Sequence, residues 1–235
     1  MSVAAPLKGL GPVVRPSVAD HVFDELHRQI LTLVLKPGTK MSEVEVAKAM
    51  EVSRQPVRDA FYRLSKLGFL VIRPQRATLV SAISETAVFQ ARFIRSAIEA
   101  ETVRVACEKL SEDDLDALGD IIELQRQAVE AEDPLRFHDL DDQFHKEICD
   151  RSGLSFAWEV IRENKAHMDR VRFLSLAFAS RAAFGDHERI FAAMRKRDSD
   201  AAMACMHEHL GRIKDQISRI RADYIEFFAG ESDLD

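Results

Sequence analysis

Apolar residues recur at intervals of three and four along most of this chain, which is the spacing of amphipathic α-helices. The first run of this kind covers residues 17–35 and ends at a Lys-Pro-Gly sequence, a common stop signal for helices. A short helix is predicted over residues 42–50, and a third helix starts at Ser53 and stops at Gly68. The first part of the chain is therefore predicted to hold three helices in succession.

A segment with strand character follows the third helix. Residues 69–72 form a short apolar run, residues 73–76 contain the proline of a turn, and residues 78–80 can return as a second strand. A hairpin placed after three helices is the order of elements in a winged helix-turn-helix, whose third helix lies against DNA and whose hairpin forms the wing. We predict this fold for residues 17–82.

From residue 84 onward the helical spacing continues almost without interruption. Ser84 can cap the first helix there, and Ser111 with Asp114 approximates a capping box at the second. Polar breaks separate the predicted helices, which lie at about 84–108, 111–131, 133–151, 154–178, 182–196 and 198–228. An antiparallel α-helical bundle is the simplest packing for such a set. The predicted fold class is therefore mainly α, a winged helix-turn-helix followed by a bundle.

Composition adds two short segments to these two domains. Residues 1–16 contain several glycines and prolines and are expected to form a flexible arm before the domain at 17–82. The all-helical domain is expected at 83–229, and a short tail at 230–235.

Charge is distributed unevenly along the chain. Residues 1–80 hold 12 lysines and arginines against 7 acidic residues, whereas residues 81–235 hold 21 against 32, within a net charge of −6. Because ionic attraction is screened within about 10 Å at 0.1 M salt, a basic region can bind nucleic acid even in an acidic protein. The N-terminal part is therefore expected to bind double-stranded DNA.

The third helix of the N-terminal part carries the chemistry that suits DNA. Ser53 can accept a hydrogen bond as the N-cap, while Val57 and Phe61 begin the apolar stripe. Arg54 and Arg58 lie four residues apart on the other face. The residues expected to contact DNA are Ser53, Arg54, Gln55 and Arg58 on this helix, and Arg73 and Arg76 at the tip of the wing.

Two further patterns restrict the location of the protein. No apolar run approaches 18 residues, and the first residues lack the basic and apolar regions of a signal peptide. Cys107, Cys149 and Cys205 are scattered on apolar helical faces without a Cys-x-x-Cys spacing, as expected for reduced thiols. We therefore expect a cytoplasmic protein that does not enter a membrane.

Possible metal ligands lie in the predicted bundle. Asp141 and His145 are four residues apart on one helix, so their side chains meet on the same face, and His187 and His209 each begin an apolar run farther along. Three imidazoles and one carboxylate suit a divalent ion, with zinc favoured and nickel or manganese as alternatives, and leave a coordination position for a ligand. The histidines expected on the surface are His21, His27, His138 and His207.

Several short motifs of the N-terminal part occur together. They are Pro37-Gly38, Ser42-Glu43, the run from Val52 to Arg58, Arg63-Leu64, Gly68 and the wing. With these motifs, residues 15–82 resemble the GntR family of bacterial transcription regulators. The wing departs from the family pattern, because Ala77 follows Arg76 where glycine is usual.

A second set of motifs lies in the C-terminal part. It consists of Arg95, Glu99, Asp141, His145, His187 and His209. With these residues the chain is similar to the FCD ligand-binding domain of the FadR subgroup, and the whole resemblance covers about residues 15–225. Leu154 departs from the pattern, since many members have asparagine there. The resemblance implies that the aspartate and the three histidines bind a metal ion.

The resemblance also implies an effector. Metal-bearing members of the subgroup commonly sense small carboxylates, so cationic side chains are expected beside the ion. Arg95 is the first candidate, and one of Arg170 and Arg172 is expected to face inward as well. Asn164 and His167 are further candidates.

Two classes of function fit these patterns. The favoured one is a metabolite-responsive homodimeric transcription regulator, usually a repressor, with Phe89, Phe93 and Ile94 as candidate dimer contacts. The alternative is a metal-dependent hydrolase or other metalloenzyme with an accessory DNA-binding domain, which would need a general base beside a metal-bound water. Glu188 and Glu208 adjoin candidate ligands but point about 100° away around the helix, so an enzyme is not expected.

Overall fold

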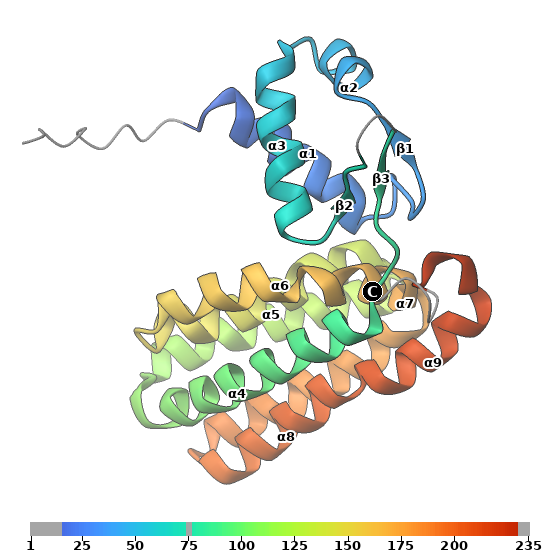
Figure 1. The fold of residues 1–235 in the computed structure, drawn as a ribbon. Helices are drawn as coiled ribbons and strands as arrows, with labels where there is room; N and C mark the ends of the chain where they lie inside the picture. The colour runs from blue at the N-terminus through green and yellow to red at the C-terminus, as the bar shows by residue number, and fades with distance from the viewer. Residues whose placement is uncertain (1–15, 74–76, 230–235) are drawn as a thin grey trace, which may run out of the picture. The chain divides into compact units, whose positions relative to one another are not determined.

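The computed structural model describes residues 16–73 and 77–229, and the chain falls into two compact units (Figure 1). The first unit holds the chain up to Arg28 together with Lys40–Val80, and the second holds Gln29–Thr39 together with the chain from Ser81. Most of the expected arm, the wing-tip residue Arg76 and the expected tail at 230–235 lie outside the described residues.

The first unit is a winged helix-turn-helix. Its helices are α1 (Val18–Leu31), whose end belongs to the second unit, α2 (Glu43–Ala49) and α3 (Arg54–Lys66). Its strands are β1 (Lys40–Met41), β2 (Leu70–Val71) and β3 (Thr78–Val80). The strands form an antiparallel sheet in the order β1-β3-β2, in which Lys40 pairs with Leu79 and Leu70 pairs with Val80. The sequence predicted the wing but not β1, which is only two residues long.

The apolar stripe of α3 packs inward as predicted. Val57, Phe61 and Leu64 are buried, together with Ala60. Ser53 occupies the N-cap position with an extended backbone, but its side chain makes no capping hydrogen bond, so this detail of the prediction is wrong. Because these four apolar residues bury one face of α3, the opposite face, which carries Arg54 and Arg58, remains available to a ligand.

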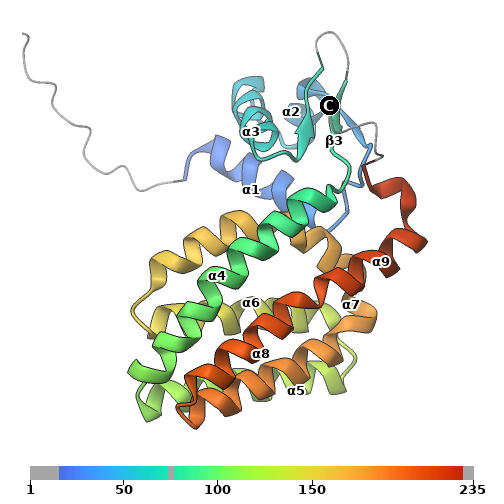
Figure 2. The same cartoon turned by 60° about the horizontal axis from the view of Figure 1, so that its bottom comes forward.

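The second unit is an α-helical bundle, shown from another side in Figure 2. Its helices are α4 (Glu85–Lys109), α5 (Glu112–Glu130), α6 (Pro134–Arg151), α7 (Ser155–Arg195), α8 (Ser199–Gly211) and α9 (Ile213–Asp223), followed by the 3₁₀ turn η1 (Ile225–Phe227). Helix α4 packs against α7 and α8, and α5 packs against α6. Ser84 caps α4 through the backbone N–H of Ala87, and Ser111 with Asp114 forms the predicted capping box. The predicted mainly α fold class is confirmed.

Two helix boundaries differ from the prediction. The break expected between residues 178 and 182 is absent, because α7 is one helix of 41 residues. The hydroxyl of Ser180 donates to the carbonyl of Leu176 within the helix, at 2.8 Å, and Gly185 is accommodated in the helical interior. The last predicted helix is instead divided at Arg212 into α8 and α9.

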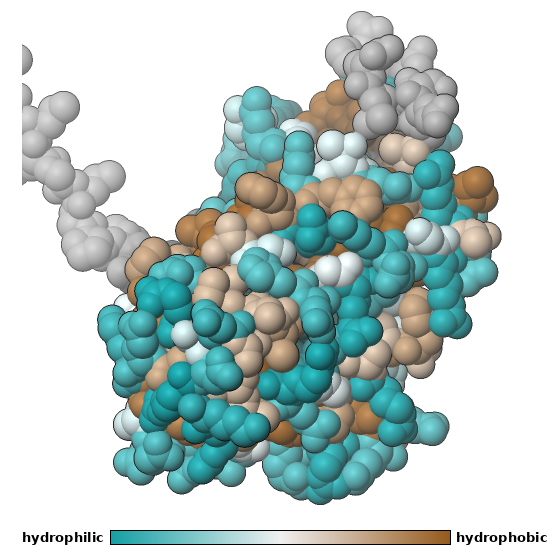
Figure 3. Space-filling view, turned by 90° about the horizontal axis from the view of Figure 1, so that it is seen from below, coloured by the Kyte–Doolittle hydropathy of each residue, from teal (hydrophilic) through white to brown (hydrophobic). Residues whose placement is uncertain are grey.

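The bundle core contains a large apolar cluster, which includes Val103, Leu115, Phe144, Ile190 and Met206. The surface is different, since the face shown in Figure 3 is mostly hydrophilic with hydrophobic residues interspersed. A core of this kind gives the helices fixed positions, and polar side chains that point inward from them are therefore fixed as well.

The continuity of α7 can be tested by replacing its Gly185 with alanine. Glycine in a helix interior costs about 0.5–1 kcal/mol relative to alanine, and a Cβ at Gly185 would meet no atom within 4 Å. Gly185→Ala should therefore raise the free energy of unfolding by about 0.5–1 kcal/mol, measured by urea denaturation at fixed protein concentration. Gly153→Ala is the matched control, because Gly153 has a φ of +74° and alanine should destabilise there. A loss of stability in Gly185→Ala would contradict the continuous helix.

Candidate functional site

The exposed face of α3 presents the residues predicted to contact DNA. The side chains of Arg54 and Arg58 are 61% and 56% exposed, and each has a guanidinium nitrogen near the carboxylate of Glu43, at 3.5 and 3.3 Å. Gln55 donates to the carboxylate of Asp59 at 2.9 Å. Ion pairs this exposed contribute little to stability, so phosphate oxygens can compete for both guanidinium groups. Ser53 and the wing residue Arg73 are exposed as well.

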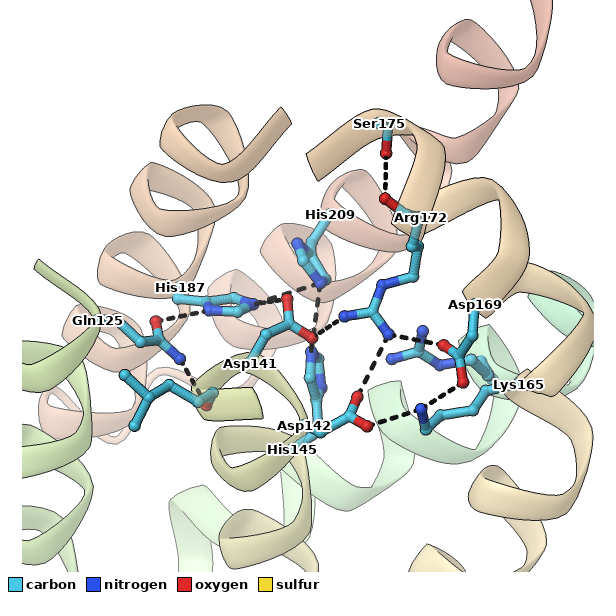
Figure 4. Close-up of polar contacts among 12 residues, drawn as sticks. Gln125, Asp141, Asp142, His145, Lys165, Asp169, Arg172, Ser175, His187 and His209 are labelled. Atoms are coloured by element: carbon cyan, nitrogen blue, oxygen red, sulfur yellow. Dashed lines mark hydrogen bonds and ion pairs between the residues drawn. The ribbon is translucent and has the colours of Figure 1, made fainter. Parts of the chain in front are cut away.

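Four side chains converge inside the bundle, from three different helices (Figure 4). Asp141 and His145 lie on α6, His187 on α7 and His209 on α8. The Nε2 atom of His209 lies 3.3 Å from that of His145 and 3.4 Å from that of His187. The carboxylate of Asp141 lies 3.6 Å from Nε2 of His187 and 4.0 Å from Nε2 of His145. The sequence prediction named these four residues, and the structure brings them together.

These separations fit a metal site. All four donor atoms lie within 4.8 Å of one another. Donors that each stand about 2.0–2.2 Å from a central ion would be about 3.4 Å apart in a tetrahedral arrangement. Nitrogen atoms of neutral imidazoles that face one another this closely also need a shared proton or a cation between them. The cluster could therefore hold a divalent metal ion.

Each imidazole of the cluster has a second residue beside its other ring nitrogen. Nδ1 of His145 lies 2.5 Å from the carboxylate of Glu99, and Nδ1 of His209 lies 3.6 Å from that of Asp186. Nδ1 of His187 lies 2.9 Å from the side-chain oxygen of Gln125. Such partners direct Nε2 of each ring toward a metal ion and keep the ring in place.

The orientation of Gln125 is itself determined by the backbone. Its amide nitrogen donates to the carbonyl of Leu140 at 2.9 Å, so its oxygen must face His187 and accept the Nδ1 hydrogen. His187 is thereby held as the tautomer whose Nε2 carries a lone pair. Sequence reasoning missed Gln125, although it is fully buried on the inner face of α5, one turn from Ile121. The sequence did contain a signal for Gln125, since it is a polar residue within the apolar stripe of α5.

The charges around the cluster set the protonation of its members. Burial alone would raise the pKa of Asp141, but the positive charge of Arg172 outweighs burial and holds this pKa well below its usual range. Burial, together with the neighbouring His209, lowers the pKa of His187 well below its usual range. Burial also lowers the pKa of His209, although Asp186 opposes the shift. An ionised carboxylate and neutral imidazoles are the forms that bind a metal ion.

A buried ionic network adjoins the cluster. Arg172 contacts the carboxylate of Asp141 and also donates to Asp142 at 3.2 Å and to Asp169 at 3.0 Å. Lys165, which is 5% exposed, joins the same two carboxylates at 2.7 and 2.6 Å. The metal-ligand candidate Asp141 is thereby connected to cationic side chains of α7, as Figure 4 shows.

A small cavity of about 50 Å³ lies against Asp141 and His209. Arg95 and Arg172, both candidates for effector binding, line it. The lining also includes Phe137, His138, Met168, Ser175, Leu176, Ser180, Arg212 and Gln216. His138, expected on the surface, lies instead at this cavity and is only partly exposed.

The other effector candidates are placed elsewhere. Arg170 is 1% exposed and donates to the carbonyl oxygens of Ser81 and Ala82, at 2.8 and 3.1 Å. Asn164 donates to the carbonyl of Val160 at 2.7 Å. Neither these two residues nor His167 line the cavity, so Arg172 is the one of the two neighbouring arginines that faces it.

The fold defines a winged-helix DNA-binding protein with an all-helical second domain. Residues 18–80 match the bacterial regulatory proteins of the gntR family, and residues 90–212 match the FCD domain. The chain belongs to the GntR family of bacterial transcription regulators, in its FadR subgroup with an FCD domain.

Several relatives share almost the whole length of the chain. It is 37% identical to the HTH-type transcriptional repressor RspR of Escherichia coli (strain K12), over 91% of this chain and 95% of the relative. It is also 37% identical to the HTH-type transcriptional regulator YdfH of Escherichia coli O6:H1, over 92% of this chain and 96% of that protein. The solved structure of E. coli McbR/YncC shares the fold, with a TM-score of 0.71 at 24% identity, over 88% of this chain and 99% of that one.

These findings decide between the two classes of function. The relatives are named as transcription regulators, so the protein is a regulator and not an enzyme, and the metalloenzyme alternative has no support. None of the described helices is both long and apolar enough to span a membrane.

The exposed face of α3 gives the first functional test. Arg54→Ala and Arg58→Ala should each weaken operator binding by about 1–3 kcal/mol if the side chain binds a guanine edge. If the side chain contacts only phosphate, affinity should fall similarly on all DNA sequences. The slope of log affinity against log salt concentration should then become smaller by about one unit. Fluorescence anisotropy across a salt series measures both. Arg104→Ala is the control, because Arg104 pairs with Glu101 and Glu108 on α4. Unchanged affinity in the double variant would exclude α3 as the recognition helix.

Proposed function

We propose that this regulator is a homodimeric repressor whose binding to its DNA operator is controlled by a small carboxylate, bound at a metal ion inside the FCD domain. The convergence of Asp141 and three imidazole Nε2 atoms on one point carries this proposal. The name of the relative RspR supports a repressor. The protein acts on DNA and is therefore assigned to the cytoplasm.

Zinc is the ion that this donor set favours. Nitrogen from His145, His187 and His209 and oxygen from Asp141 suit a borderline divalent ion, and nickel and manganese accept the same donors. The ion would provide positive charge and open coordination positions toward the cavity. Glu99, Gln125 and Asp186 would keep the three rings oriented toward it.

A carboxylate suits the cavity beside these residues. Burying an anion alone in the bundle would be costly, so it needs cationic partners there. Arg95 and Arg172 both line the cavity, and Arg95 forms a buried ion pair with Glu99 at 2.6 Å. A carboxylate held by the ion and by Arg172 would change the contacts of Arg172 with Asp141, Asp142 and Asp169.

Helix α7 offers a route from the cavity to the start of the bundle. Arg172 faces the cavity, while Arg170, two residues earlier, holds the carbonyl oxygens of Ser81 and Ala82. These two residues follow β3 directly in the chain. A shift of α7 on effector binding would therefore reach the segment that leads to the winged helix, and would change the population of DNA-binding arrangements.

His187→Ala tests the metal site. It should lower metal content, thermal midpoint and effector response together, because a bound ion at a thousandfold excess over Kd stabilises the fold by about 4 kcal/mol. Binding of DNA without effector should remain, since His187 lies in the second unit. Elemental analysis, a melting curve and operator release by a panel of small carboxylates give the three readouts.

The control for this test is His207→Ala, because His207 is exposed on α8. Full metal occupancy in His187→Ala would show that this residue is not a ligand. Normal operator release by effector in a protein stripped of metal would refute a role of the ion in sensing.

Two operator half-sites require two winged helices held together, so the regulator should be a dimer. Phe93 is 70% exposed and Phe89 is 36% exposed, one turn apart on α4, which makes this face a candidate contact. Light scattering at micromolar concentration should give twice the chain mass of 26.6 kDa, and Phe93→Glu should shift it toward the monomer. Leu135→Glu, at a residue 57% exposed on α6, should leave the mass unchanged. A monomeric native protein would contradict the proposal.

A further inference from the structure

Glu43 places an acidic side chain among the basic residues that the first unit presents to DNA. It is the first residue of α2, and its carboxylate lies 3.5 Å from a guanidinium nitrogen of Arg54 and 3.3 Å from one of Arg58. The side chain of Glu43 is less exposed than either arginine. Two guanidinium groups therefore share one carboxylate on the face that carries the predicted DNA contacts.

The stability of the winged helix does not explain this arrangement. Ion pairs as exposed as these contribute little to stability. A negative charge in the first turn of α2 interacts favourably with the helix dipole, but Glu45 in the same turn supplies one, and Ser42 caps the helix through the backbone N–H of Glu45. The position of Glu43 between the two arginines thus points to a role in binding DNA.

Glu43 engages one edge of the Arg58 guanidinium and leaves the other end available. The Nε atom of Arg58 lies 3.4 Å from each carboxylate oxygen, and its Nη2 atom lies 3.3 Å from one of them. Because a guanidinium group has five N–H donors, the end formed by Nη1 and Nη2 keeps donors for another acceptor. Two parallel donors match O6 and N7 of guanine. Glu43 can therefore orient Arg58 while Arg58 binds a base.

The same carboxylate acts against contacts with phosphate. In a helix-turn-helix, the helix before the recognition helix crosses the DNA backbone, and α2 has that place in this chain. A negative charge at its first residue repels phosphate groups within about 10 Å at 0.1 M salt. Glu43 also leaves the group of three side chains with a net charge of +1, where the two arginines alone would carry +2. Non-specific binding, which depends on such charge, is therefore weakened.

We propose that Glu43 is a specificity-determining residue, which orients Arg54 and Arg58 toward base edges and disfavours their contact with phosphate. It increases the preference for the operator by weakening the binding of other DNA sequences. This rests on the predicted contacts of Arg54 and Arg58 with DNA, and it is independent of the metal ion and the effector.

Glu43→Gln tests the role, because it removes the charge and keeps the size of the side chain. Two duplexes of equal length are compared, an operator that the native protein selects from a randomised pool and a shuffled version of it. Affinity for the shuffled duplex should rise about five- to tenfold, and its slope against log salt concentration should become steeper by about one unit. Affinity for the operator should change by less than about twofold, because lost repulsion and lost orientation oppose one another. Fluorescence anisotropy with the full-length protein measures both.

Glu25→Gln is the matched control, because Glu25 pairs with Arg28 on α1 and its replacement changes the charge of the first unit equally. It should leave the ratio of the two affinities as in the native protein. Glu43→Asp keeps the charge and should retain most of the ratio. Glu43→Ala is a second variant in case Glu43→Gln does not fold, since alanine suits a helix, and it should lower the ratio as Glu43→Gln does.

An unchanged ratio in folded Glu43→Gln or Glu43→Ala, or an equal fall in Glu25→Gln, would overturn the role of Glu43. A merely structural role would lower the thermal midpoint and leave the ratio unchanged. If the double variant Arg54→Ala/Arg58→Ala binds the operator normally, the assignment of α3 as the recognition helix fails, and the role of Glu43 fails with it.

Discussion

Asp141 brings a negative charge into the interior of the bundle, and the polar residues around it are arranged to compensate that charge. Asp141 is 3% exposed, and its carboxylate lies against Arg172 and the imidazoles of His145 and His187. Removing one partner of a buried ion pair typically costs about 3–5 kcal/mol, because the other charge stays buried. The position of Arg172 at the cavity is thus tied to Asp141, and a ligand that attracts either group must affect both.

Much of the site could be predicted from local spacing. Asp141 and His145 share a helical face by their separation of four residues, and the winged helix follows from the order of three helices and a hairpin. The partners of the histidines could not be predicted in this way. Gln125 reaches His187 only because α5 packs against α6 and the carbonyl of Leu140 orients the amide.

Packing and contacts distant in sequence explain where the structure differs from the predictions and where it decides an alternative that the sequence left open. Ser180 and Gly185 are weak helix breakers, and the packing of α7 along the bundle outweighs their low helix propensity. Arg170 and Arg172 differ by 200° around the helix, but spacing alone does not say which one points to a cavity. Arg170 is assigned by the carbonyl oxygens of Ser81 and Ala82, which lie 88 residues or more away in sequence. His138 was expected on the surface because nothing local marks the wall of a cavity.

The segment that follows β3 is held by two separate parts of the second unit, helix α7 and the residues after α9. Arg170 binds its first two carbonyl groups, while Ile83 donates to the carbonyl of Phe227 at 2.7 Å and accepts from the N–H of Ala229 at 3.0 Å. The contacts of Ile83 therefore form only after residues 227–229 have been synthesised. During translation, the winged helix can fold well before its attachment to the bundle is complete. A chain that is cut before Phe227 would retain the DNA-binding unit but lack one of the two attachments of this segment.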